Sequence, residues 1–152
     1  MIDAFDRKII ATLQRDARIT IAQLAQEVSL SATPVSRRVR ALEEAGVITG
    51  YVPRLDARKL GLELEAFVLI NLDRHEDAII AGFEARIAEN PYVIACHAVT
   101  GDNDYLLNVV ARNVDHLSEI TLKTLLRIPG VRDLKSIIAL ESVKRARGIP
   151  VE

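Results

Sequence analysis

Two segments at the start of the chain, residues 3–18 and 20–28, carry apolar residues at the spacing of an amphipathic helix. Asp3 is the predicted N-cap of the first segment, and Thr20 with Gln23 forms a capping-box pattern at the start of the second. The second helix has only about two turns and is marginal alone, so we expect it to pack against its neighbours. The positions expected to face inward are Phe5, Ile9, Ile10 and Leu13, then Ile21, Leu24, Ala25 and Val28.

A third helix is predicted for residues 31–45, with Ser31 as N-cap and Gly46 as the residue that ends it. Its buried stripe is expected to consist of Val35, Val39 and Leu42. Only Ser29 and Leu30 separate this helix from the second, apart from the cap. So short a connection turns the third helix sharply across the second, which is the arrangement of a helix-turn-helix.

The side of the third helix opposite the buried stripe is basic. Between Ser31 and Leu42 there are three arginines and no acid. Guanidinium groups pair with phosphates and read guanine edges, and hydroxyl groups bond to phosphates or bases. We therefore predict that this helix enters the DNA major groove, the alternative being a solvated face with a chance excess of arginine. The predicted DNA-contacting residues are Ser31, Thr33, Pro34, Ser36, Arg37, Arg38 and Arg40.

Residues 47–56 contain strand-forming residues interrupted by Gly50 and Pro53. We interpret this stretch as a short wing or an exit strand. From residue 63 the pattern changes, and strands alternate with helices in the order β-α-β-β-α-β, which is typical of a ferredoxin-like antiparallel sheet with both helices on one face. The predicted segments are strands 64–73, 92–100, 105–112 and 131–144 and helices 76–90 and 114–128.

Apolar residues lie on both faces of the first and last predicted strands. Phe67 and Leu69 oppose the set that begins at Leu64, and Ile137 opposes Ile138. Helices on one face leave the other face uncovered, so the pattern predicts a partner, most simply a second copy of the chain. A dimer also supplies the two reading heads that a two-fold DNA site requires.

The composition indicates a cellular compartment, and the charges are unevenly distributed along the chain. Residues 1–62 carry a net charge of +3 and the rest of the chain −4, so the N-terminal part is the better candidate for contacting a polyanion. No apolar run approaches the roughly 18 residues of a membrane span, and no secretory signal is visible, so no membrane partner is expected. Cys96 is the only cysteine, which fits a reducing cytoplasm.

The chain resembles the Lrp/AsnC family, the feast/famine regulators, over nearly its full length. The sequence motifs on which the resemblance rests are short, but their order and spacing are specific. They are Asp6 with Ile9-Ile10 and Leu13, Ala25, Val28-Ser29-Leu30-Ser31, Arg38-Val39, Leu42-Glu43, Gly46-Val47-Ile48, Gly50-Tyr51, residues 100–105 (TGDNDY) and Pro129-Gly130-Val131. The resemblance implies an α+β chain with a plain or winged helix-turn-helix, a ferredoxin-like effector and assembly domain, dimers that join into octamers, and amino-acid effectors.

The turn at residues 100–105 is the candidate effector site. Asp102 and Asp104 can bind an ammonium group, and backbone N–H groups around Gly101 can take a carboxylate. By itself such a sequence is usually just a hairpin turn, and it is the resemblance that favours a pocket here. The predicted effector-binding residues are Thr100, Gly101, Asp102, Asp104 and Tyr105, with Ser136 and Glu141 completing the pocket across a subunit boundary.

The sequence offers no catalytic constellation, so we expect neither an enzyme nor a metal or other cofactor beyond the effector. The three histidines are far apart, and Cys96 and His97 are neighbours in a strand and point to opposite faces. The predicted domains are a DNA-binding domain at 1–50, a linker at 51–62, and an effector and oligomerisation domain at 63–152. Two alternatives to an effector-responsive regulator stay open, which are an amino-acid-binding regulatory subunit of a metabolic enzyme and an architectural DNA-binding protein without effector.

Overall fold

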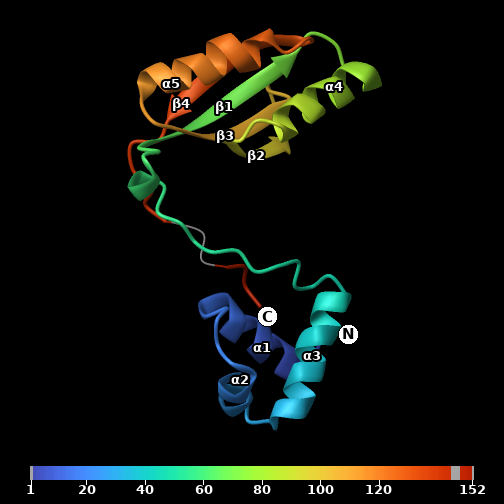
Figure 1. Cartoon of the computed structure of the whole chain (residues 1–152). Helices are drawn as coiled ribbons and strands as arrows, with labels where there is room; N and C mark the ends of the chain where they lie inside the picture. The colour runs from blue at the N-terminus through green and yellow to red at the C-terminus, as the bar shows by residue number, and fades with distance from the viewer. Residues whose placement is uncertain (1, 145–147, 152) are drawn as a thin grey trace. The chain divides into compact units, whose positions relative to one another are not determined.

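The computed structural model describes residues 2–144 and 148–151 of the 152-residue chain (Figure 1). The chain folds as two compact units. The first comprises Met1–Arg54 together with Val143–Glu152, and the second comprises Leu55–Ser142. This division groups the described residues 143–144 and 148–151 with the helical unit, whereas the sequence-based limits assign them to the effector domain. Within the described residues, no helix is long and apolar enough to cross a membrane.

The first unit consists of three helices with the expected caps: α1 (Ala4–Arg15), α2 (Ile21–Val28) and α3 (Ala32–Glu44). Asp3 and Asp6 form a reciprocal capping box at the start of α1, and Thr20 and Gln23 form another at the start of α2. The helices enclose a small aliphatic core, which confirms the predicted inward faces except at their ends, where Phe5 and Ile21 stay exposed. The buried apolar residues of this core are Ile9, Leu24, Ala25, Val28, Val35 and Leu42.

The stretch after α3 is not a strand, so the predicted wing or exit strand is wrong. Gly46 has a φ of +69° and ends the helix, and the N–H groups of Val47 and Ile48 both donate to the carbonyl of Leu42. Residues 49–56 then form no strand and no helix. Gly50 and Pro53 interrupt the stretch, and no strand among the described residues pairs with it.

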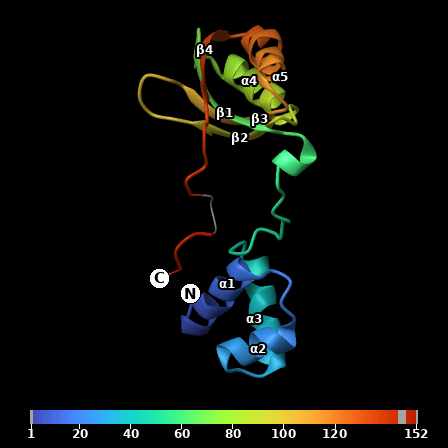
Figure 2. The ribbon, with the colours of Figure 1, turned by 90° about the vertical axis from the view of Figure 1, so that its left-hand side faces the viewer.

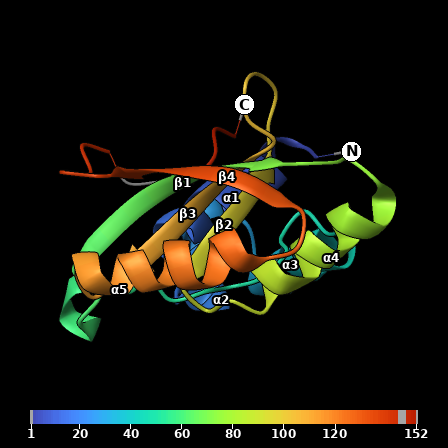
Figure 3. The ribbon, with the colours of Figure 1, turned by 90° about the horizontal axis from the view of Figure 1, so that it is seen from above.

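The second unit is the predicted ferredoxin-like fold. After a single 3₁₀ turn, η1 (Arg58–Leu60), the four strands form one sheet in the order β2-β3-β1-β4, and every neighbouring pair is antiparallel. Both long helical segments of this unit lie on the same side of the sheet (Figures 2 and 3). Its elements are β1 (Leu64–Leu72), α4 (Asp77–Ala88), β2 (Val93–Ala98), β3 (Tyr105–Ala111), α5 (Val114–Ser118), η2 (Glu119–Thr124), η3 (Leu125–Arg127) and β4 (Val131–Ile138).

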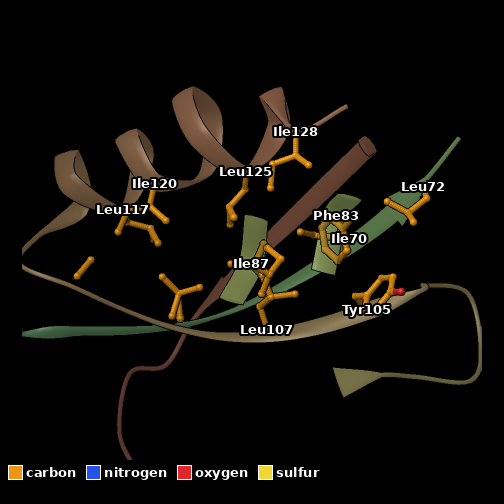
Figure 4. Packing of buried hydrophobic residues seen from close by; sticks show 14 residues of the cluster. Ile70, Leu72, Phe83, Ile87, Tyr105, Leu107, Leu117, Ile120, Leu125 and Ile128 are labelled. Carbon is orange, nitrogen blue, oxygen red and sulfur yellow. The ribbon is translucent and has the colours of Figure 1, made fainter. Parts of the chain in front are cut away.

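The core of this unit lies between the helices and one face of the sheet (Figure 4). Alternate residues of β1 point into it, namely Ala66, Val68, Ile70 and Leu72, as the period of two predicts. The helices contribute Phe83, Ile87, Leu117, Ile120, Leu125 and Ile128. The opposite face is less covered, since the side chains of Phe67 and Ile137, which are paired in register, stay 37% and 46% exposed.

Two elements differ from the predicted segments. The helix predicted for residues 114–128 forms one continuous helical segment, but its geometry changes along its length. α5 is α-helical, η2 is π-helical and η3 is a 3₁₀ turn. The last strand ends at Ile138 instead of reaching residue 144. Ile138 pairs with Ala66, and the N–H of Ala139 donates to the carbonyl of Glu65, so the chain beyond runs past the start of β1 and loses its partner.

Candidate nucleic-acid interface and effector turn

The turn between α2 and α3 depends on an unusual backbone conformation at Ser29. This residue has φ 57° and ψ 45°, the left-handed region that L-residues with a Cβ rarely adopt. Its N–H donates to the carbonyl of Gln26, and the N–H of Leu30 donates to that of Ala25, so α2 stops within one residue. The sequence predicts the short turn but gives no signal for this conformation, because serine is not a residue that favours it.

The exposed face of α3 carries most of the predicted DNA contacts. The side chains of Ser31, Thr33, Ser36, Arg37 and Arg40 are exposed, and Pro34 is half-buried in the first turn. Ser31 occupies the N-cap position, but its side chain makes no capping hydrogen bond, which leaves the hydroxyl available to a phosphate oxygen.

The two exposed arginines differ in their partners. Arg37 has no hydrogen bond or ion pair with any residue in the described ranges. Arg40 donates from Nε to Glu44 at 2.8 Å, one turn further along the same face. Both members of that pair are largely exposed, and exposed pairs of this kind are weak. Arg40 can therefore exchange Glu44 for a phosphate.

Arg38 does not face outward with them. Its Nη1 donates to Asp3 at 2.7 Å and to Asp6 at 2.8 Å, and its guanidinium lies 5.6 Å from the centre of the Phe5 ring. The hydrogen bonds that Arg38 donates to Asp6 and Asp3 raise the pKa of Arg38. The pKa of Asp3 is lowered by the backbone N–H of Asp6, which donates to it, and by Arg38. The structure thus places Arg38 against α1, where it positions α3, and away from the face predicted to contact DNA.

Some of the residues predicted to bind the effector are exposed on the turn, whereas others are buried or hydrogen-bonded within the fold. Thr100, Gly101 and Asp102 are exposed, and Gly101 has a φ of +111° that suits glycine. Tyr105 is buried, with its ring 4.6 Å from that of Phe83, and its hydroxyl donates to Glu84 at 3.2 Å.

Asp104 holds the turn to the end of β1. Its Oδ2 accepts the N–H of Leu72 at 2.8 Å, and its Oδ1 lies 2.9 Å from Nε2 of His75. The Leu72 hydrogen bond is the main cause that lowers the pKa of Asp104, and His75 adds to it. Both oxygens are therefore already bonded, unlike those of Asp102. The contact with His75 was not predicted, because nothing in the spacing of residues 75 and 104 signals it.

Glu141 is not next to this turn within one chain. The N–H of Asp104 donates to the carbonyl of Ile70, near the C-terminal end of β1, whereas the end of β4 pairs near the N-terminal end of β1. Glu141 follows that end of β4, at the opposite end of the sheet from the turn, and Ser136 pairs with Val68 in the middle of β1. A site that combines Glu141 with the turn needs a second copy of the chain.

Cys96 and His97, which are neighbours in β2, do not share a site. Cys96 packs against the core of the second unit while His97 is exposed, as their opposite directions predict, and burial raises the pKa of the Cys96 thiol. Within the described ranges, no group of three or more histidine, cysteine or acidic side chains is placed to hold a metal ion.

Comparison with known proteins places both units. Residues 2–49 match the family model of a winged helix-turn-helix DNA-binding domain, and residues 65–149 match that of the Lrp/AsnC ligand binding domain. A Bkd operon transcriptional regulator of Pseudomonas aeruginosa is 42% identical over 93% of both chains, and a leucine-responsive regulatory protein of Rhizobium meliloti is 41% identical over 95% of this chain and 93% of its own length.

Solved structures agree with this placement. A transcriptional regulator of Neisseria meningitidis, crystallised as a complex with L-methionine, superposes with a TM-score of 0.95 at 33% identity. The match covers 99% of this chain and 97% of that one. The chain therefore belongs to the Lrp/AsnC family of transcriptional regulators, with an N-terminal helix-turn-helix domain that binds DNA and a C-terminal ligand-binding domain.

Proposed function

We propose that the protein regulates transcription by placing α3 in the DNA major groove and that an amino acid bound at the turn of residues 100–105 modulates this binding. The observation that carries the first part is the pair of neighbouring arginines on α3. Arg38 is held by Asp3 and Asp6 and fixes the helix, whereas Arg37 is exposed and has no partner in the described chain. A rigid helix with a free guanidinium group suits a site on DNA.

An electrophoretic shift on the DNA upstream of its own gene tests the assignment of α3. The Arg37→Ala/Arg40→Ala double variant should lose the shift while its circular dichroism spectrum and elution volume stay those of the wild type. Arg7→Ala is the matched control, because Arg7 is an exposed arginine of the same unit on α1. If the double variant bound this DNA as well as the wild type does, α3 would not be the recognition helix.

The amino-acid part rests on the turn and on the relatives. Leucine appears in the name of one relative and L-methionine in the structure of another. In this chain the exposed carboxylate of Asp102 suits the ammonium group of an amino acid, and the backbone around Gly101 suits its carboxylate. Asp104 keeps the turn in place through Leu72, and Ser136 and Glu141 reach the pocket from another copy.

A thermal-shift screen of the twenty amino acids tests this part. We expect one or a few apolar amino acids to raise the melting temperature, and Asp102→Asn to remove the rise without lowering the melting temperature of the free protein. Asp115→Asn, at an exposed acid of α5, is the control. If no amino acid shifts the melting temperature, the architectural alternative gains support; DNA binding would be unaffected by that result.

We further propose that a second copy covers the open face of the sheet. Phe67 and Ile137 form an exposed apolar pair there. Asn108 on β3, whose Nδ2 donates to Glu65 at 2.9 Å, has a buried Oδ1 with no partner in the described chain. A buried acceptor is seldom left unpaired, so it fits an interface that supplies a donor. Light scattering should show a dimer or larger assembly for the wild type and a smaller species for Ile137→Glu.

A further inference from the structure

A second groove lies on the helical side of the ligand-binding unit, apart from the effector turn. It is formed by the C-terminal end of α4, the turn that follows it, and the helix that runs from α5 to η3, and its volume is about 570 Å³. This is within the range of pockets that hold small ligands, roughly 300–1,000 Å³. None of residues 99–105, and none of β4, lines this groove.

His116 supplies a hydrogen-bond donor that the protein itself does not use. The residue is 7% exposed, and its Nδ1 accepts the N–H of Arg112 at 3.1 Å. With Nδ1 as the acceptor, the proton of the ring lies on Nε2. The ring meets that of Tyr92 edge-on at 4.4 Å, both residues line the groove, and within the described ranges Nε2 has no hydrogen-bond partner. Among the described residues Nε2 is not one of the atoms that are both buried and unpaired, so it is accessible from the groove and can donate to an acceptor on a ligand there.

Two arginines flank this donor. Arg86 from the last turn of α4 and Arg127 from η3 both line the groove, and neither has an ion-pair partner among the described residues. Of the two acids on the groove, Glu119 is paired with Lys123 at 3.4 Å, which leaves Glu89 alone against both guanidinium groups. The groove is therefore net positive and rich in donors.

The wall of the groove is the π-helical segment. Glu119, Lys123 and Thr124 of η2 all line it, and Thr124 donates from its hydroxyl to the carbonyl of Glu119, five residues earlier. π-helical turns are rare and occur frequently at functional sites. Ile120 and Ile128 add an apolar surface beside the charged groups.

We propose that this groove binds a small metabolite through a phosphoryl group, with Arg86, Arg127 and Nε2 of His116 as the donors. Three separate donor groups match the three terminal oxygens of a phosphoryl group better than the two oxygens of a carboxylate. Tyr92 and the isoleucines contact the remainder of the ligand. The protein thus takes a second class of ligand, on a surface separate from the amino-acid turn.

Inorganic phosphate, titrated into the full-length protein labelled with ¹³C at histidine Cε1, tests this proposal. The chain has only three histidines, so His75 and His97 serve as internal references. At constant ionic strength, phosphate should shift the His116 signal saturably, whereas chloride and succinate should not. The Arg86→Gln/Arg127→Gln variant should bind about 100-fold more weakly, since it loses two charged hydrogen bonds and each is worth about a factor of ten or more.

Arg112→Gln is the control, because it keeps the backbone N–H that bonds His116 and its side chain does not line the groove. It should bind phosphate as the wild type does. A His116 signal that does not move, or that moves equally with chloride, overturns the proposal. So does a double arginine variant that binds phosphate like the wild type, and a response to succinate alone overturns the choice of a phosphoryl group.

Discussion

Arg38 of α3 donates to the carboxylate of Asp6 in α1 at 2.8 Å, and the same Nη1 reaches Asp3 at 2.7 Å. The two aspartates form the capping box of α1, and each uses its other carboxylate oxygen to accept a backbone N–H of that box. One guanidinium group therefore joins the first turn of α1 to the middle of α3. The orientation of the reading helix depends on this junction as well as on the aliphatic core.

Arg38→Ala should lower both the melting temperature of the helical unit and its affinity for DNA. The reason is that two cap carboxylates lose their shared cation and α3 loses a fixed contact to α1. Arg37→Ala, one residue earlier on the same helix, should lower the affinity alone. Calorimetry of both variants, with anisotropy measurements on operator DNA, separates the two roles. Equal melting temperatures would show that Arg38 does not position α3.

Asp104 should make the ligand-binding unit sensitive to acid. Its pKa is lowered in the folded state from a usual value of 3.8, so its contribution to stability is complete above that value and is lost as the pH falls through the lower folded pKa. Asp104→Asn should reduce the free energy of unfolding at pH 7 by roughly 1–2 kcal/mol, because a charged acceptor of the Leu72 N–H becomes neutral.

The difference between Asp104→Asn and the wild type should then narrow as the pH falls below 3.8. Urea unfolding at a series of pH values, followed by the fluorescence of the tyrosines, measures it. Asp102→Asn is the control, since Asp102 is exposed and its carboxylate has no hydrogen bond or ion pair among the described residues. A difference that stays constant down to pH 3 would contradict the role given to Asp104.

Ser29→Gly should stabilise the helical unit, because glycine adopts the left-handed conformation of this turn without steric cost. The gain is expected to be about 0.5–1 kcal/mol, after the greater freedom of glycine in the unfolded chain is allowed for. Ser29→Val should do the opposite, since a β-branched residue fits this region worst. Thermal unfolding of the two variants checks the order, and a valine variant as stable as the glycine variant would refute the strained turn.

Two glycines of the ligand-binding unit should respond to alanine with opposite signs. Gly130 has a φ of +91°, and a Cβ there would collide with Cγ2 of Ile79, so Gly130→Ala should cost about 1–3 kcal/mol. Gly82 lies within α4 with open space around it, so Gly82→Ala should add about 0.5–1 kcal/mol. Denaturant unfolding of both variants tests the pair, and a neutral effect at Gly130 would mean that Ile79 moves aside.

The features that could be predicted from the sequence are those written in local patterns. The spacing of Thr20 and Gln23 predicts the start of α2. The alternation of inward-facing and outward-facing residues from Ala66 to Leu72 predicts both the strand and its buried face. The order of the strands follows from the succession of elements, because the ferredoxin-like connection admits few arrangements. The exposed positions of Ser36 and Arg37 follow from the helical period once Val35 is placed inside.

The features that could not be predicted depend on residues far apart in the chain. Arg38 looks like its neighbours in the sequence, and only the packing of α1 against α3 brings it to Asp6, 32 residues away. Asp104 looks like a free ligand for an ammonium group until the end of β1 supplies the Leu72 N–H and His75 approaches. The predicted strand at residues 47–56 is wrong for a related reason, since strand-forming residues need a partner strand and none of the described strands pairs with this region.

If α3 is the recognition helix, Arg37 contacts the DNA backbone or a base edge directly. The dependence of operator affinity on salt concentration, measured for the wild type, Arg37→Ala and Arg7→Ala, tests this contact. Loss of one phosphate contact should reduce the slope of log affinity against log salt by about 1 in Arg37→Ala, with no change in Arg7→Ala. A weaker but equally salt-dependent Arg37→Ala would place the residue on a base edge. An affinity and slope identical to those of the wild type would show that Arg37 does not contact DNA.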